Sequence, residues 1–174
     1  MIREARCNEP EQNLWGISFR QGLFNMTSDS HLFKDSTAPE RLPLYEAKMI
    51  HQFDHRWASY RLEDGKNTSG DVALVDKHNP DFYVMPRYWV DRVEVEQRLQ
   101  DRNWRNGWML GYRRISNATN ERTFLITPIP AYAAGDSVFL IFSDQLPQLV
   151  SALVGCLNSL IFDFVCRQKW GDLI

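Results

Sequence analysis

The sequence is poor in cysteine, in long apolar runs and in net charge, and each shortage excludes a class of protein. Cys7, Cys156 and Cys166 are its three cysteines, and no two of them form a C-x-x-C pair. This spacing supports neither a disulfide framework nor a cysteine zinc site, and it fits a reducing compartment. No apolar run approaches the roughly 18 residues of a membrane span, and the polar N-terminus lacks the apolar centre of a secretion signal. We therefore expect a cytoplasmic protein without a membrane partner.

The formal net charge of -2 excludes a polycationic surface that would by itself indicate nucleic acid. Any such function needs a local basic patch. Hydrophobic residues make up 44% of the chain and aromatic residues 13%, enough for a real core. The length of 174 residues predicts a single domain over 1–174.

Local patterns predict a mixed α/β (α+β) fold, with a small, mostly antiparallel sheet packed against a few helices. Apolar runs predict a strand at 13–19 and a sheet meander from strands at 108–115, 123–129 and 138–142. The charged segment 90–103 is typical of a surface helix. Turn-forming residues at 63–71 predict an exposed loop.

Two further segments carry a helical spacing. Apolar residues recur at intervals of three and four from Leu146 to Phe164, which predicts a long C-terminal helix with a buried face. In the segment 45–57, Tyr45 and three later apolar residues recur every four positions, which predicts a second helix. A loop with a short strand is the alternative for that segment.

The segment 42–64 also contains two weak catalytic patterns. Glu46 and Lys48 have the E-x-K spacing of Mg²⁺-dependent nucleases, but no aspartate on a preceding strand completes such a site. His51 and His55 have the H-x-x-x-H spacing of zinc sites, but the glutamate of metalloproteases and a third ligand are missing. Hydrogen-bonded or solvated histidines are the simpler interpretation.

A local basic patch is present between Arg87 and Arg122. This segment holds eight arginines and five acidic residues, interleaved with tyrosine and tryptophan. Arginine forks and aromatic rings suit phosphate contacts and the reading of base edges. A solvated helix with ion pairs explains the same composition, and both interpretations stay open.

Four phrases of the sequence together resemble a known family. They are "WGISFRQGLFNMTSDSHLF", "LPLYEAKMIHQFDHRWASY", "WMLGYRRISNATNERTFLITPIP" and "LVGCLNSLIFDFVCRQKWG". In this order they resemble the C-terminal target-recognition region, of the TaqI-like specificity type, of adenine-N6 DNA methyltransferases from restriction-modification and phage-exclusion systems. Ala47 departs from the family pattern, which has a glycine there.

The resemblance implies a module that reads double-stranded DNA as part of a larger methyltransferase. The catalytic domain, with its S-adenosylmethionine, would precede this chain. The chain itself has no complete N-P-P-Y motif, because Asp81 replaces the second proline in "HNPDF", and it has no glycine-rich cofactor loop. We therefore expect no catalytic residue, cofactor or metal in this chain.

The chemistry of the side chains and the resemblance together suggest ten DNA-binding residues. The candidate phosphate contacts are Lys48, Arg56 and Lys169, and Gln52 and His55 are expected beside them. The candidate base readers are Arg113, Arg114, Asn117, Asn120 and Arg122. Two alternatives remain open: a Mg²⁺-dependent nuclease using Glu46 and Lys48, and a protein-docking module of a defence complex.

Overall fold

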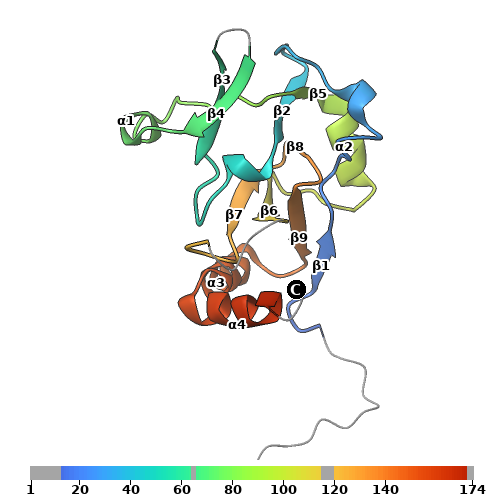
Figure 1. Cartoon of the computed structure of the whole chain (residues 1–174). Helices are drawn as coiled ribbons and strands as arrows, with labels where there is room; N and C mark the ends of the chain where they lie inside the picture. The colour runs from blue at the N-terminus through green and yellow to red at the C-terminus, as the bar shows by residue number, and fades with distance from the viewer. Residues whose placement is uncertain (1–12, 64–65, 115–119, 172–174) are drawn as a thin grey trace, which may run out of the picture.

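The computed structural model describes residues 13–63, 66–114 and 120–171. Within these ranges the chain has a mixed α/β fold with mostly antiparallel strand pairs, as the sequence predicts (Figure 1).

The largest sheet has four antiparallel strands in the order β1-β9-β6-β7. These are β1 (Ile17–Arg20), β9 (Val138–Ser143), β6 (Trp108–Arg113) and β7 (Ile126–Pro130). The three strands expected near these positions in the second half are confirmed. The predicted meander is wrong. A meander would place β7 between β6 and β9, whereas the structure places β6 between β7 and β9. Between β7 and β9 the chain forms β8 (Ala133–Ala134), which belongs to another sheet.

That second sheet has the order β5-β2-β8. Its central strand β2 (Arg41–Tyr45) is antiparallel to β5 (Trp89–Asp91) and parallel to β8. The segment around Gly22 runs close beside β8, and Phe24 donates its N–H to Ala134 O at 3.0 Å.

A separate hairpin pairs β3 (Ala58–Glu63) with β4 (Lys66–Asp71). The predicted loop at 63–71 is therefore wrong about secondary structure, although most of β4 is exposed. In the view of Figure 1 this hairpin stands at the end of the molecule opposite to the C-terminal helices.

The helices are short. They are α1 (Leu74–Lys77), α2 (Arg92–Gln100), α3 (Pro147–Leu157) and α4 (Leu160–Gly171), with 3-10 turns η1 (Ser30–Leu32) and η2 (Ala47–Met49). The surface helix expected at 90–103 is confirmed as α2. No single helix in the described ranges is long and apolar enough to cross a membrane, although α3 and α4, bent by 60°, have that length and composition together.

The C-terminal helix is confirmed, with a break between α3 and α4. At the break, the buried Asn158 turns its amide towards β7. Its Nδ2 donates to Ile126 O at 2.9 Å, and its Oδ1 accepts from Ile126 N at 3.4 Å. Only α3 contributes strongly to the core, through Val150, Leu153 and Val154, so the apolar stripe is not buried along its whole length.

The helix predicted over 45–57 is wrong, and the alternative of a loop with short strands is right. Tyr45 belongs to β2, and after the single turn of η2 the backbone at Ile50 is extended, with φ −116° and ψ 149°. Pairing of β2 with both neighbours outweighs the helical spacing. That spacing places Tyr45 and Met49 in the core but leaves Phe53 59% exposed.

Two apolar clusters cover the two faces of the four-stranded sheet. Val150 and Val154 of α3 pack with Leu110 of β6 on one face. Met109, its neighbour in β6, packs into the larger cluster, which contains Met49. Neighbouring residues of a strand point to opposite faces, which explains this division.

Candidate functional site

The loop between η2 and β3 carries three of the ten candidate residues, Gln52, His55 and Arg56, and it contains a tight turn. His51 and Asp54 exchange backbone hydrogen bonds, with N···O distances of 2.7 and 3.1 Å. Inside this turn Phe53 has φ 58°, a left-handed conformation that is unfavourable for a bulky side chain. Asp54 also forms a 2.6 Å ion pair with Lys77. Burial acts to raise the pKa of Asp54, but hydrogen bonds from Lys77 and from the Arg56 backbone lower it overall.

Arg56 is held inside this region by backbone carbonyls. Its guanidinium donates to Lys77 O at 2.7 Å, to Asn79 O at 3.1 Å and to Phe82 O at 3.3 Å. These bonds connect the loop to the segment that follows α1. The geometry favours a structural role for Arg56 over a phosphate contact.

Gln52 and Arg113 also donate hydrogen bonds to backbone carbonyls. Gln52 Nε2 donates to Asn158 O at 2.8 Å, which joins the turn to the break between α3 and α4. Arg113 Nε and Nη2 both donate to Ile50 O, at 3.0 and 2.7 Å. A guanidinium committed to a carbonyl in this way has fewer donors left for a guanine edge.

The paired histidines have no arrangement typical of a metal site in the described part of the chain. His51 stacks on Trp57, with ring centroids 4.1 Å apart. Burial lowers the pKa of both His51 and His55, with further contributions from Arg113 and Arg56 respectively. No group of three or more His, Cys, Asp or Glu side chains that could hold a metal ion occurs among the residues that the structure describes.

Both residues of the E-x-K pair, Glu46 and Lys48, contact Tyr60. Glu46 Oε1 accepts a hydrogen bond from the Tyr60 hydroxyl at 2.8 Å, and Lys48 Nζ lies 4.8 Å from the centroid of the same ring. In the described part of the chain, Glu46 belongs to no group of three or more side chains that could hold a metal ion such as Mg²⁺. This arrangement gives the nuclease alternative no geometric support.

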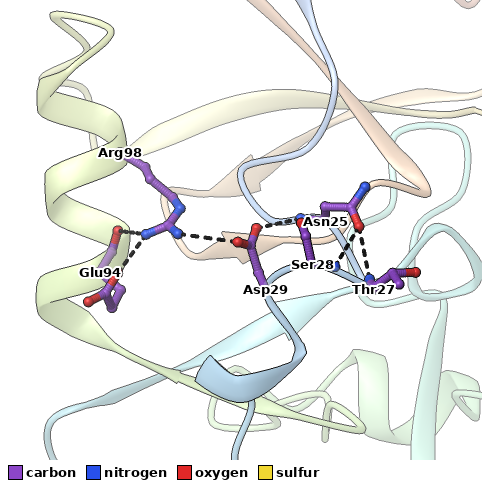
Figure 2. A network of polar contacts seen from close by, with 6 residues as sticks. All are labelled: Asn25, Thr27, Ser28, Asp29, Glu94 and Arg98. Carbon is purple, nitrogen blue, oxygen red and sulfur yellow. Dashed lines mark hydrogen bonds and ion pairs between the residues drawn. The ribbon is translucent and has the colours of Figure 1, made fainter.

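In the arginine-rich segment, Arg98 stabilises the fold. It bonds Glu94 within α2 at 2.7 Å and lies 3.8 Å from Asp29 (Figure 2). Asp29 in turn accepts from the backbone N–H of Asn25 at 2.8 Å. The guanidinium also lies 4.2 Å from the centroid of Phe24. For this arginine, the interpretation of a helix with ion pairs is the better one.

Three of the remaining candidates lie at the surface. Arg114 is exposed, with its guanidinium 5.6 Å from the Phe139 centroid. Asn120 and Lys169 are exposed, and Arg122 is half-buried. Asn117 lies outside the described residues. Arg167 of α4 donates to Asn120 O at 2.9 Å, so this end of the β6–β7 connection lies against α4.

Two surface features were missed in the sequence. The first is the β3–β4 ribbon, whose sequence signal was the Asp-Gly pair at 64–65, a common hairpin turn. The second is an apolar surface on α4, formed by Leu160, Ile161, Phe164 and Val165, which are 50–79% exposed. Their helical spacing predicted burial and gave no signal that they face outward.

Comparison of the sequence with family models gives no match, and none of the curated proteins matches it.

Proposed function

We propose that this chain is a target-recognition module that binds double-stranded DNA and directs an attached adenine-N6 methyltransferase domain to its site. The observation that carries the proposal is the projecting β3–β4 ribbon. A two-stranded ribbon fits the major groove of B-DNA, where each base pair presents a distinct pattern of donors and acceptors. The chain itself has no catalytic role in this proposal, and S-adenosylmethionine belongs to the methyltransferase domain.

The ribbon presents hydrogen-bonding side chains in a defined register. Arg61 and Thr68 lie directly opposite each other, and Glu63 and Lys66 form the next pair on that face. All four are exposed. Asn67 is exposed on the other face, opposite Leu62. Arginine suits guanine and asparagine suits adenine, which supports reading of bases by this element.

Exposed cations elsewhere supply the phosphate contacts of the proposal. Lys48 and Lys169 keep this role because their side chains lie at the surface. Arg114, which the sequence suggested as a base reader, joins them because it is also exposed. Arg113, Arg56 and Gln52 donate to backbone carbonyls instead and have a structural role in the proposal. The four phrases that resemble target-recognition regions are independent support from the sequence.

The test is a map of adenine methylation made by the intact protein in cells that carry its gene. Arg61→Ala together with Asn67→Ala should lower methylation at the native sites at least tenfold or change the sequence that is methylated. Each base contact is worth about 1–3 kcal/mol of discrimination.

Arg105→Ala is the matched control, because Arg105 is exposed in the connection between α2 and β6. Unfolding curves should be the same for all variants. An unchanged methylation map and unchanged DNA affinity in the ribbon variant would exclude the ribbon as the reading element.

A protein-docking module is the second candidate, favoured by the exposed apolar surface on α4. Contiguous apolar surface of this kind is typical of protein contacts. Ile161→Lys with Phe164→Lys should abolish co-purification of a partner after nuclease treatment. Leu74→Lys, at a 69% exposed position of α1, is the control. Association that disappears with nuclease treatment alone would favour DNA binding instead.

A further inference from the structure

A second site lies beside β2, in a cleft that is separate from the β3–β4 ribbon and that includes two of the expected DNA-binding residues, His55 and Arg56. Its volume is about 520 Å³, within the range of pockets that bind small molecules. The cleft is bounded by β2, β5, the residues His55 and Arg56, and the segment 80–85.

The walls of the cleft are aromatic. They include Phe82, Tyr83, Trp89 and Tyr132. Tyr83 is 75% exposed, so its ring is available to a ligand rather than committed to the core. Aromatic side chains of this kind provide stacking surfaces for nucleobases.

The charged residues of the cleft are all basic. Arg41, Arg56 and Arg92 line it, and no Asp or Glu among the described residues does. Arg41 is fixed by Asp91 at 3.3 Å and Arg56 by backbone carbonyls. Arg92 is exposed, and its side chain forms no hydrogen bond or ion pair with any residue in the described ranges. Its guanidinium is therefore available to an anion such as a phosphate.

Two polar side chains in the cleft have unused hydrogen-bonding capacity. Tyr45 is only 3% exposed, yet its hydroxyl forms no hydrogen bond within the part of the chain that is described. Because Tyr45 lines the cleft, its hydroxyl is available to a ligand there. His55 also forms no side-chain hydrogen bond there, and burial next to Arg56 lowers its pKa and favours the neutral imidazole. Each group offers one donor and one acceptor, as the edge of a nucleobase requires.

We infer that this cleft binds a nucleotide, with the base against the aromatic walls and its edge at Tyr45 and His55, and the phosphate at Arg92. A free mononucleotide and a nucleotide extruded from a DNA strand share this chemistry. The inference does not depend on the ribbon, because the two sites use different residues.

Calorimetric titration of the chain with the four deoxynucleoside monophosphates is the first arm of the test. Tyr45→Phe keeps the ring and should weaken nucleotide binding about 3–10-fold, the effect of one hydrogen bond. Arg92→Gln should weaken nucleotides about tenfold or more and leave the corresponding nucleosides unaffected. Arg105→Gln, outside the cleft, should change neither, and thermal unfolding monitors the fold of each variant.

The second arm uses duplex DNA with 2-aminopurine at single positions, whose fluorescence rises when that base leaves the stack. A rise that Tyr45→Phe reduces identifies an extruded nucleotide as the ligand. Mononucleotide binding without this signal identifies a free nucleotide. The inference is overturned if neither arm gives a signal at millimolar nucleotide and micromolar duplex, or if both substitutions leave the signals unchanged. Loss of DNA reading in the ribbon variants would not affect either result.

Discussion

Arg113 illustrates how one side chain can look like a contact for DNA and yet hold two parts of the chain together. Its two hydrogen bonds to Ile50 O connect the end of β6 to the loop before β3, 63 residues apart. Its guanidinium is half-buried, and burial lowers its pKa. A charged donor paired with a carbonyl is worth more than a neutral one.

Arg113→Ala should therefore lower the free energy of unfolding by about 1.5–3 kcal/mol. Chemical denaturation monitored by tryptophan fluorescence measures it. Arg114→Ala is a matched control, because Arg114 is the exposed neighbour and its loss should cost within about 0.5 kcal/mol. Equal effects for the two variants would contradict the structural role of Arg113.

Gly22 marks a close approach of two backbones. A Cβ at this position would lie 2.1 Å from Gly135 O. Such a contact requires the segment beside β8 to move. This movement would disturb the hydrogen bond from Phe24 N–H to Ala134 O. Space, and not an unusual φ, makes glycine necessary here.

Gly22→Ala should destabilise the protein by about 2 kcal/mol or more, measured as a lower melting temperature by calorimetry. Gly70→Ala is the control, because a Cβ at Gly70 meets nothing within 4 Å. A Gly22→Ala variant as stable as Gly70→Ala would show that the two segments can separate at little cost.

Among the elements, α4 is held to the rest of the fold by Asp163. This carboxylate accepts backbone N–H groups of Thr123 and Phe124 at 2.7 and 2.9 Å, and Arg167 lies 3.4 Å from it. Burial acts to raise its pKa, but these partners lower it overall. The ionised form is thus favoured in the folded state.

A lowered pKa in the folded state adds stability that is present above the unfolded pKa and is lost as the pH falls through the folded one. The free energy of unfolding should therefore decrease from about pH 4 downward. Asp163→Asn should flatten this decrease and cost about 1–3 kcal/mol at pH 7. Part of the acid sensitivity should remain, because the pKa of Asp54 is lowered as well. Urea unfolding between pH 2 and 7 measures both effects.

The elements that sequence predicted are those whose pattern is local. The strands β6, β7 and β9 have a clear apolar pattern, and the helix α2 has the charged composition of a surface helix. The segment 45–57 has a helical spacing too, but its backbone pairs with distant strands, and a spacing alone cannot reveal such pairing. The break at Asn158 depends on a partner 32 residues away, and so was equally hidden.

The candidate site could be predicted only in part for the same reason. The sequence shows which residues have cationic or amide side chains, but it does not show which of these side chains donate to backbone carbonyls. Gln52, Arg56 and Arg113 each donate to backbone oxygens at least 21 residues distant. Lys48, Arg114 and Lys169 lie at the surface, where sequence placed them.

At the scale of the whole molecule, the proposed DNA binding would have to work against a net charge of -2. Few phosphate contacts then carry most of the electrostatic attraction, and each releases about one counterion. Lys169→Gln should lower DNA affinity at all sequences alike and reduce the slope of log K against log salt by about one. Fluorescence anisotropy over a salt series measures the slope, and Arg105→Gln should leave it unchanged. A constant slope in both variants would remove Lys169 from the DNA surface.

The order of the four-stranded sheet also affects how the chain is made. Ile17 of β1 pairs with Ser143 of β9, so β1 has its partner far along the chain. At a synthesis rate of about 5–20 residues per second, β1 waits roughly 6–25 s on the ribosome before β9 exists. During that time its exposed backbone edge is open to pairing with other nascent chains. Slow translation of the region between the two strands should therefore promote aggregation.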